Sequence, residues 1–134
     1  MSLKLVKINQ NTKINIHQSD HYKFNRKMNS IIEKAWLTEQ KRLKNKLFNG
    51  QIVSFNSIKK NTIHANYRSY KLLVAQNLHP ELFSEINLQP LAFSGILECL
   101  DGFIIGRRNQ YQTQDAGKWE LVPSGGIEKV FDDK

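Results

Sequence analysis

The sequence predicts a mixed α+β protein, because strand-like alternation occurs on both sides of one strong helical pattern. Residues 13–17 and 51–58 alternate apolar and polar side chains, as half-buried strands do. Between them, apolar side chains recur at helical spacing from Ile32 to Leu47. After Pro90 the chain consists mainly of apolar runs broken by turn residues, which is typical of strands and loops.

The first part of the chain is predicted to form two strands, 4–8 and 13–17, followed by the helix. Ser30 and Glu33 have the spacing of a capping box, so we expect the helix to begin near them. The Asn-Gly pair at 49–50 is expected to end it, because glycine readily adopts the left-handed conformation found at helix ends.

Further elements follow the helix. Residues 51–58 and 62–67 are predicted strands, and residues 69–76 a helix. A short helix is expected from Pro80 through Ile86, because proline fits the first turn of a helix.

The β-rich part contains the strongest turn signal. Apolar runs at 91–100 and 103–108 flank Asp101-Gly102, a dipeptide that favours a β-hairpin. A polar loop, 109–117, then leads to a strand-like segment at 118–122. Cys99 lies in the first apolar run, so we expect it to be a small buried residue.

The charge and the pattern of apolar residues change together near residue 88. Residues 1–71 hold 15 Lys and Arg against three acidic residues, whereas residues 72–100 contain no basic residue. We therefore expect a basic α+β region at 1–88 and a separate β-rich region at 89–134.

The bulk composition excludes several classes of protein. Hydrophobic residues make up 40% and charged residues 24%, which is ordinary for a globular domain. No apolar run approaches the roughly 20 residues that span a membrane, and the N-terminus lacks the apolar core of a signal peptide. The single cysteine excludes a disulfide framework and fits a reducing compartment, so we expect a cytoplasmic protein with no membrane partner.

Residues 94–128 carry a set of spaced motifs. A hairpin ending in Gly106-Arg107-Arg108 is followed by the polar loop and then by Gly117-Lys-Trp-Glu-Leu-Val-Pro-Ser-Gly-Gly-Ile-Glu128. This order resembles the opening of the Nudix hydrolase fold, where the last piece reads approximately G-x-W-E-x-P-G-G-x-x-E. Ser124, which precedes the glycine pair, departs from that pattern. Together with the long basic N-terminal extension, it looks similar to the branch that hydrolyses UDP-sugars.

The resemblance implies a fold and a set of site residues. Residues 89–134 would supply the first β-hairpin and strand of a Nudix-type α/β/α sandwich. The substrate would be a nucleoside diphosphate linked to another group, with Arg107 or Arg108 contacting phosphate and Trp119 packing beneath the site or stacking on a base. The main-chain carbonyl of Gly125 or Gly126 would be a ligand of Mg²⁺.

The residue types suit that chemistry, and each also has a simpler interpretation. Arginine presents a planar fork that matches phosphate oxygens, and successive glycines let a ligand approach the main chain closely. Arg107 and Arg108 alternate across a strand, however, so at most one of them is expected to face a pocket. Trp119 is more often a core residue than a stacking platform, and the glycine pair can be a simple turn. The four histidines lack metal-ligand spacing and are interpreted as structural or surface residues: His17, His21, His64 and His79.

The catalytic part of the family motif is expected to lie outside this chain. The Nudix box continues from its second glycine as G-x5-E-x7-R-E-U-x-E-E-x-G-U, with U aliphatic. When this pattern is aligned on Gly126, the position of its first glutamate is occupied by Asp132. The sequence then reaches Lys134 before the positions of the glutamate helix. The resemblance therefore implies Mg²⁺ in the complete enzyme, with none bound and no catalysis by this chain alone. Apolar strands without their normal cover are also expected to drive self-association or packing onto the N-terminal region.

Two other classes of function remain open. The basic front of the chain is expected to be either a solvated surface or a binding module for nucleic acid or an acidic protein. A binding module would gather lysine and arginine on one face, whereas solvation would scatter them. The third alternative is a structural or regulatory domain without a ligand.

Overall fold

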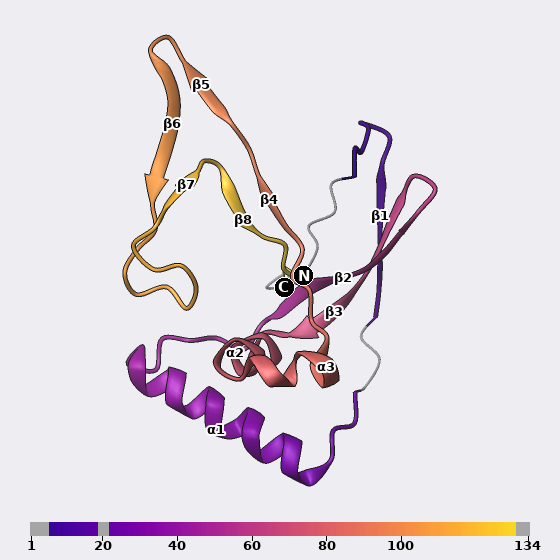
Figure 1. The fold of residues 1–134 in the computed structure, drawn as a ribbon, viewed down its shortest axis with the longest axis vertical. Coiled ribbons are helices and arrows are strands. Elements are labelled where there is room, and N and C mark those ends of the chain that lie inside the picture. Colours follow the sequence, from indigo (N-terminus) through magenta and orange to yellow (C-terminus); the bar gives the residue numbers. More distant parts are fainter. Residues whose placement is uncertain (1–5, 19–21, 131–134) are drawn as a thin grey trace.

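A long helix lies beneath a small sheet and two shorter helices in the N-terminal part of the molecule (Figure 1). The computed structural model describes residues 6–18 and 22–130. It confirms the mixed α+β class. In chain order the elements are β1 (Lys13–His17), α1 (Arg26–Arg42), β2 (Gln51–Lys59), β3 (Thr62–Ser69), α2 (Tyr70–Leu78), the 3-10 turn η1 (Pro80–Leu82), α3 (Phe83–Ile86), β4 (Ala92–Ser94), β5 (Leu97–Cys99), β6 (Gly102–Arg107), β7 (Trp119–Leu121) and β8 (Ser124–Gly126).

Helix α1 begins earlier than the capping box at Ser30 predicts. Asn25 is the N-cap, and its side-chain oxygen accepts a hydrogen bond from the main-chain N–H of Met28 at 2.9 Å. Asparagine is among the best N-cap residues, and here it satisfies one of the free N–H groups of the first turn before the chain reaches Ser30. The predicted helix start was therefore wrong by about one turn.

The end of α1 also differs from the prediction. The helix ends at Arg42, well before Gly50, and both Lys44 and Asn45 have positive φ angles. The side chain of Gln40 donates to the carbonyl of Leu47 at 2.9 Å and accepts from its N–H at 3.2 Å. This pair of bonds folds the following segment back along the helix, so the Asn-Gly pair is not the terminator.

Three strands form the N-terminal sheet in the order β1–β3–β2. β1 runs parallel to β3, and β2 runs antiparallel to it with a bulge between Phe55 and Ser57. The predictions for β1, β2, β3, α2 and the short helix after Pro80 are confirmed. Residues 6–8 of the first predicted strand are not in a strand, and residues 4–5 lie outside the described part.

The apolar core lies between α1, α2 and the turn of helix that follows it. Eight buried residues form its central cluster: Met28, Ile32, Ala35, Leu73, Ala75, Leu82, Ile86 and Leu88. The buried side chain of Gln76 donates to the carbonyl of Leu88 at 2.8 Å and accepts from its N–H at 2.9 Å. Both main-chain groups are thus satisfied where the chain leaves the core.

The C-terminal strands stand away from this core (Figure 1). β4 pairs with β8, while β5, β6 and β7 form a separate antiparallel sheet. The run predicted as one strand, 91–100, is therefore divided into two, because its halves pair with different partners. The hairpin at Asp101-Gly102 is confirmed, with Cys99 paired to Gly102. Cys99 itself is exposed, so the prediction that it is buried was wrong.

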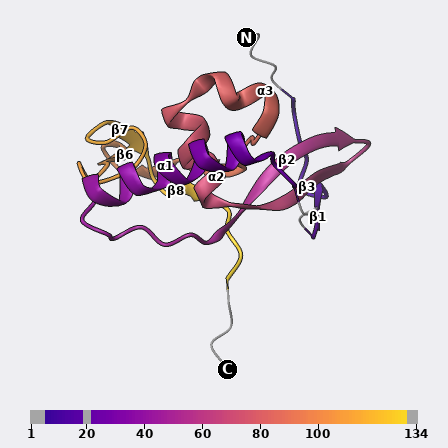
Figure 2. The same ribbon diagram turned by 90° about the horizontal axis from the view of Figure 1, so that it is seen from below.

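Main-chain hydrogen bonds along β2 join the two regions. Val53 N–H donates to the carbonyl of Ile127 at 2.8 Å, and its own carbonyl accepts from Leu91 N–H at 2.8 Å. Lys129 N–H donates to the carbonyl of Gln51 at 2.8 Å. The segment after β8 therefore runs along β2. Seen from below, α1 runs across α2, and the β1–β3–β2 sheet extends to one side of these helices (Figure 2). Within the described ranges, no helix is both long enough and apolar enough to cross a membrane.

Candidate functional site

A cavity of about 730 Å³ lies where the two regions meet. Its N-terminal wall comes from the segment before β2, from β2 itself and from the start of α2, including Phe48, Gly50, Ile52 and Tyr70. The loop after β6 and the β4–β8 pair line the other side. The quoted motif pieces contribute these residues to that wall: Arg107, Arg108, Glu120, Ser124, Gly125, Gly126, Ile127 and Glu128.

Both arginines contribute to the cavity lining, which corrects the expectation that at most one would. Arg107 is the last residue of β6, and Arg108 lies just beyond it, where strand alternation no longer applies. The Arg107 Nε donates to the carbonyl of Gly117 at 3.0 Å. Arg108 Nη1 donates to Glu120 Oε2 at 2.6 Å, while its buried Nε has no hydrogen-bond partner among the described residues. Both arginines thus line the cavity, and each guanidinium group is held by a hydrogen bond from within the C-terminal region.

The two glycines lie in β8 and differ in what their carbonyls face. Hydrogen bonds from Gly95 N–H to Pro123 and from Ile127 N–H to Leu91 flank the β4–β8 pair. Because hydrogen-bonded and non-hydrogen-bonded pairs alternate in an antiparallel ladder, Gly125 falls in a bonded pair and Gly126 in a non-bonded one. The carbonyl of Gly126 therefore points away from β4 and is the better placed of the two to accept a ligand.

Trp119 lies outside the cavity lining. It pairs with Arg107 across β6 and β7, and its side chain is 65% exposed. The simpler interpretation of Trp119 as a core residue was therefore wrong, because nothing in the described residues covers this part of the sheet. Its proposed contact with substrate is not supported by its place in the fold.

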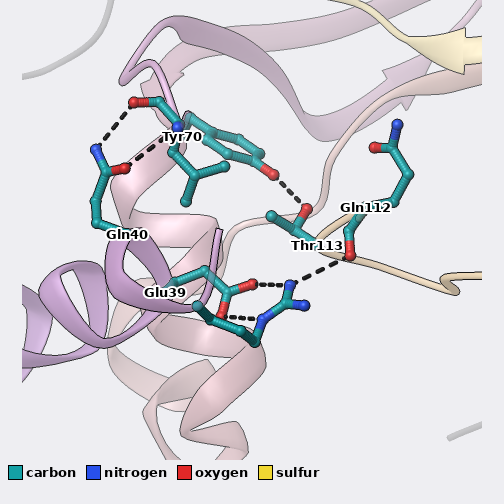
Figure 3. A network of polar contacts seen from close by, with 7 residues as sticks. Glu39, Gln40, Tyr70, Gln112 and Thr113 are labelled. Atoms are coloured by element: carbon teal, nitrogen blue, oxygen red, sulfur yellow. Dashed lines mark hydrogen bonds and ion pairs between the residues drawn. The ribbon is translucent and has the colours of Figure 1, made fainter. Parts of the chain in front are cut away.

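A polar network holds the loop after β6 against the N-terminal region (Figure 3). The hydroxyls of Tyr70 and Thr113 hydrogen-bond at 2.5 Å, and Arg42 Nη2 donates to the carbonyl of Gln112 at 3.3 Å. Arg42 also makes a two-pronged ion pair with the buried Glu39. The hydrogen bond from Arg42 to Glu39 raises the pKa of the Arg42 guanidinium above its ordinary value, and the negative charge of Glu39 also raises it. The network anchors one wall of the cavity to α1 and α2.

The sequence motifs did not identify the N-terminal wall of the cavity. Phe48 and Tyr70 lie far from the motif region along the chain, and Phe48 falls where the helix was expected to continue. No local signal in the sequence marked either residue as part of a site.

The histidines form no metal centre in the described part of the chain. The rings of His17 and His64 stack with centroids 5.8 Å apart across β1 and β3. His79 lies beside Glu81, whereas His21 lies outside the described residues. Within residues 6–18 and 22–130, no group of three or more His, Cys, Asp or Glu could hold a metal ion.

Comparisons with known proteins return no relative. No family model, no curated protein and no solved structure matches the chain. The interpretation of the cavity therefore depends on the residues that line it.

Proposed function

We propose that the chain is the substrate-binding part of a Nudix-type pyrophosphohydrolase. Its cavity would bind the pyrophosphate of a nucleoside diphosphate linked to another group, such as a UDP-sugar. One observation supports this most strongly: the two arginines, the glycine pair and Glu128, which the resemblance marks in the sequence, line one cavity. The volume of about 730 Å³ is within the range of small-molecule sites.

The arginines suit the negative charge of a diphosphate. Arg107 is exposed at the cavity and presents a planar fork to phosphate oxygens. Arg108 is oriented by its hydrogen bond to Glu120, whose charge compensates part of its own. Both side chains would therefore position the diphosphate, with Arg107 supplying most of the uncompensated charge.

The oxygen donors of the cavity fit Mg²⁺ in kind. Mg²⁺ prefers carboxylate and carbonyl oxygens, and Gly126, Glu120 and Glu128 all belong to the lining. In the complete enzyme the ion would polarise the pyrophosphate and lower the pKa of the attacking water. The carbonyl of Gly126 would be one ligand, and the glutamate helix implied by the resemblance would supply others.

The sandwich architecture is part of the same proposal. The strands of the β5–β6–β7 sheet carry apolar side chains on both faces, and these are exposed here. A sheet that is apolar on both faces is typical of the central layer of an α/β/α fold. The single exposed cysteine remains consistent with the proposal of a reducing, cytoplasmic compartment.

Calorimetric titration with inorganic pyrophosphate tests the proposal. The chain should bind pyrophosphate, and Arg107→Gln should weaken binding roughly 10- to 100-fold, because charge-assisted hydrogen bonds are lost. Arg26→Gln on α1, outside the cavity lining, is the matched control and should bind like the wild type. Absence of pyrophosphate binding by the wild-type chain would remove the proposal.

An activity assay tests whether this chain catalyses hydrolysis by itself. With Mg²⁺ and UDP-glucose, this chain should release no uridine monophosphate above the uncatalysed rate. Robust turnover would contradict the proposal that catalysis needs further glutamates.

A second candidate function is polyanion binding by the outer face of α1. Lys27, Lys34 and Lys41 are exposed and recur every seven residues, so they lie along one side of the helix. The other exposed lysines lie elsewhere, including Lys59 and Lys60 at the β2–β3 turn, as expected for solvation. A salt-dependent gel shift of nucleic acid that is lost on replacing the three α1 lysines with glutamine would favour this candidate.

A further inference from the structure

Phe48 presents a large aromatic ring at the cavity. Its side chain is 76% exposed although it is a phenylalanine and lines the cavity wall. A Cβ added to Gly50 would lie 3.4 Å from Cδ1 and Cε1 of Phe48, so the ring rests against the main chain of Gly50. One side of the ring thus contacts Gly50, and the rest of the ring is accessible to a ligand.

The segment that carries Phe48 is firmly held. The side-chain oxygen of Asn49 accepts hydrogen bonds from Lys71 N–H and Ser69 Oγ, each at 2.8 Å. The carbonyl of Gly50 accepts from Tyr70 N–H at 3.0 Å. Because the side chain of Ser69 makes no capping bond itself, Asn49 serves as the cap of α2. The main chain next to Phe48 is thus held in place, which lowers the entropic cost of binding a planar ligand.

The opposite side of the cavity offers unused amides. Gln112 and Gln114 both line it, and within the described part of the chain neither side-chain amide has a hydrogen-bond partner. Figure 3 shows the Gln112 side chain directed away from the carbonyl that accepts from Arg42. A carboxamide presents a donor beside an acceptor, which matches the edge of a nucleobase.

We infer that Phe48 stacks on the base of the nucleoside diphosphate and that Gln112 and Gln114 hydrogen-bond to its edge. This inference rests on the proposed function, since it assigns the other end of the same ligand. Aromatic rings stack on nucleobases favourably whatever the base, and the amides then add selectivity. The arginines hold the diphosphate, while the N-terminal region, through Phe48, recognises the base.

Titration calorimetry with two ligands, uridine diphosphate and inorganic pyrophosphate, tests the inference on the full chain. Phe48→Ala should weaken binding of uridine diphosphate roughly tenfold and leave pyrophosphate binding unchanged, because only the former contains a base. Phe48→Tyr, which keeps the ring, should restore uridine diphosphate binding. Phe103→Ala is the control, since Phe103 is 64% exposed on β6 and outside the cavity lining.

The other possible outcomes show whether the stacking role or the proposed function is wrong. If Phe48→Ala binds both ligands like the wild type, the stacking role is wrong and the diphosphate site stands. Equal weakening of both ligands would mean that Phe48 maintains the cavity rather than the base contact, which also overturns the inference. If the wild type binds neither ligand, the proposed function itself fails.

Discussion

Residues 22–88 and residues 89–130 differ in where they place their apolar side chains. Among residues 6–18 and 22–130, the thirteen buried hydrophobic residues all lie between Met28 and Leu88. The later region instead exposes most of its large apolar residues: Phe93, Ile96, Leu97, Leu100, Phe103, Ile104, Ile105, Tyr111, Trp119, Leu121 and Val130. The first region has its own core, whereas the strands of the second obtain little burial from the rest of the described chain.

The strand register explains why this exposure is two-sided. Leu97 pairs with Ile104, and Ile105 pairs with Leu121. Since Ile104 and Ile105 point to opposite faces of β6, the two pairs cover opposite faces of the sheet. All four residues are exposed, so neither face is packed. Exposed apolar surface of this extent is typical of an interaction site or of a layer that requires cover.

The largest expected effect is a difference in the free energy of unfolding between substitutions in the two regions. Leu88→Ala should lower the free energy of unfolding by about 2–5 kcal/mol, because Leu88 is fully buried and its removal leaves a cavity. Leu97→Ala, at a residue 47% exposed, should change it by about 0.5 kcal/mol or less. Urea denaturation of both variants measures the difference. Similar losses would show that the second region is packed after all.

Self-association should depend on the second region alone. We expect the chain to elute as a dimer or larger species in size-exclusion chromatography, because both faces of the β5–β6–β7 sheet are uncovered. Ile105→Lys places a charge on one face and should shift elution toward the monomer. Leu37→Lys, on the exposed face of α1, should not. A wild-type chain that stays monomeric at high concentration would refute this prediction.

The contact between the regions should be sensitive to one hydroxyl. Tyr70→Phe removes the hydrogen bond to Thr113, worth about 0.5–1.5 kcal/mol. Amide hydrogen exchange should therefore become faster in the loop 109–114. Tyr111→Phe is the matched control, since the Tyr111 hydroxyl has no partner among the described residues. Equal exchange in wild type and Tyr70→Phe would mean that other contacts hold the loop.

The smallest effect concerns an exposed ion pair in the second region. Lys118 Nζ donates to Asp115 Oδ1 at 2.6 Å, and this hydrogen bond, then the charge of Lys118, lowers the pKa of Asp115 below its ordinary value of 3.8. Because the pKa of Asp115 is lower in the folded than in the unfolded state, the ion pair stabilises the fold at pH values above 3.8. This stabilisation is lost as the pH falls from the ordinary pKa through the lowered one. Carboxyl NMR titration should show the pKa of Asp115 rising in Lys118→Gln. An unchanged pKa would show that the pair does not form in solution.

Local sequence signals predicted most elements and part of the candidate site. The structure confirms the strands around residues 51–69, the helix after Pro80 and the turn at Asp101-Gly102. These elements could be predicted because each depends on side chains adjacent in sequence. The helix boundaries were wrong because the cap at Asn25 and the fold-back at Gln40 compete with weaker local signals. Tertiary pairing likewise divided the strand expected at 91–100.

The sequence alone determined the α+β class and the two motifs that carry the arginines and the glycine pair. Alternation, turn residues and motif spacing are properties of neighbouring residues, so they can be read without the fold. Only the tertiary structure decided that Phe48 and Tyr70 share a cavity with Arg107, and that Trp119 does not. Pairing of β2 with the segment around Ile127 and docking of the loop after β6 bring these residues together. Such long-range contacts depend on packing and hydrogen bonding between distant segments, which no local pattern encodes.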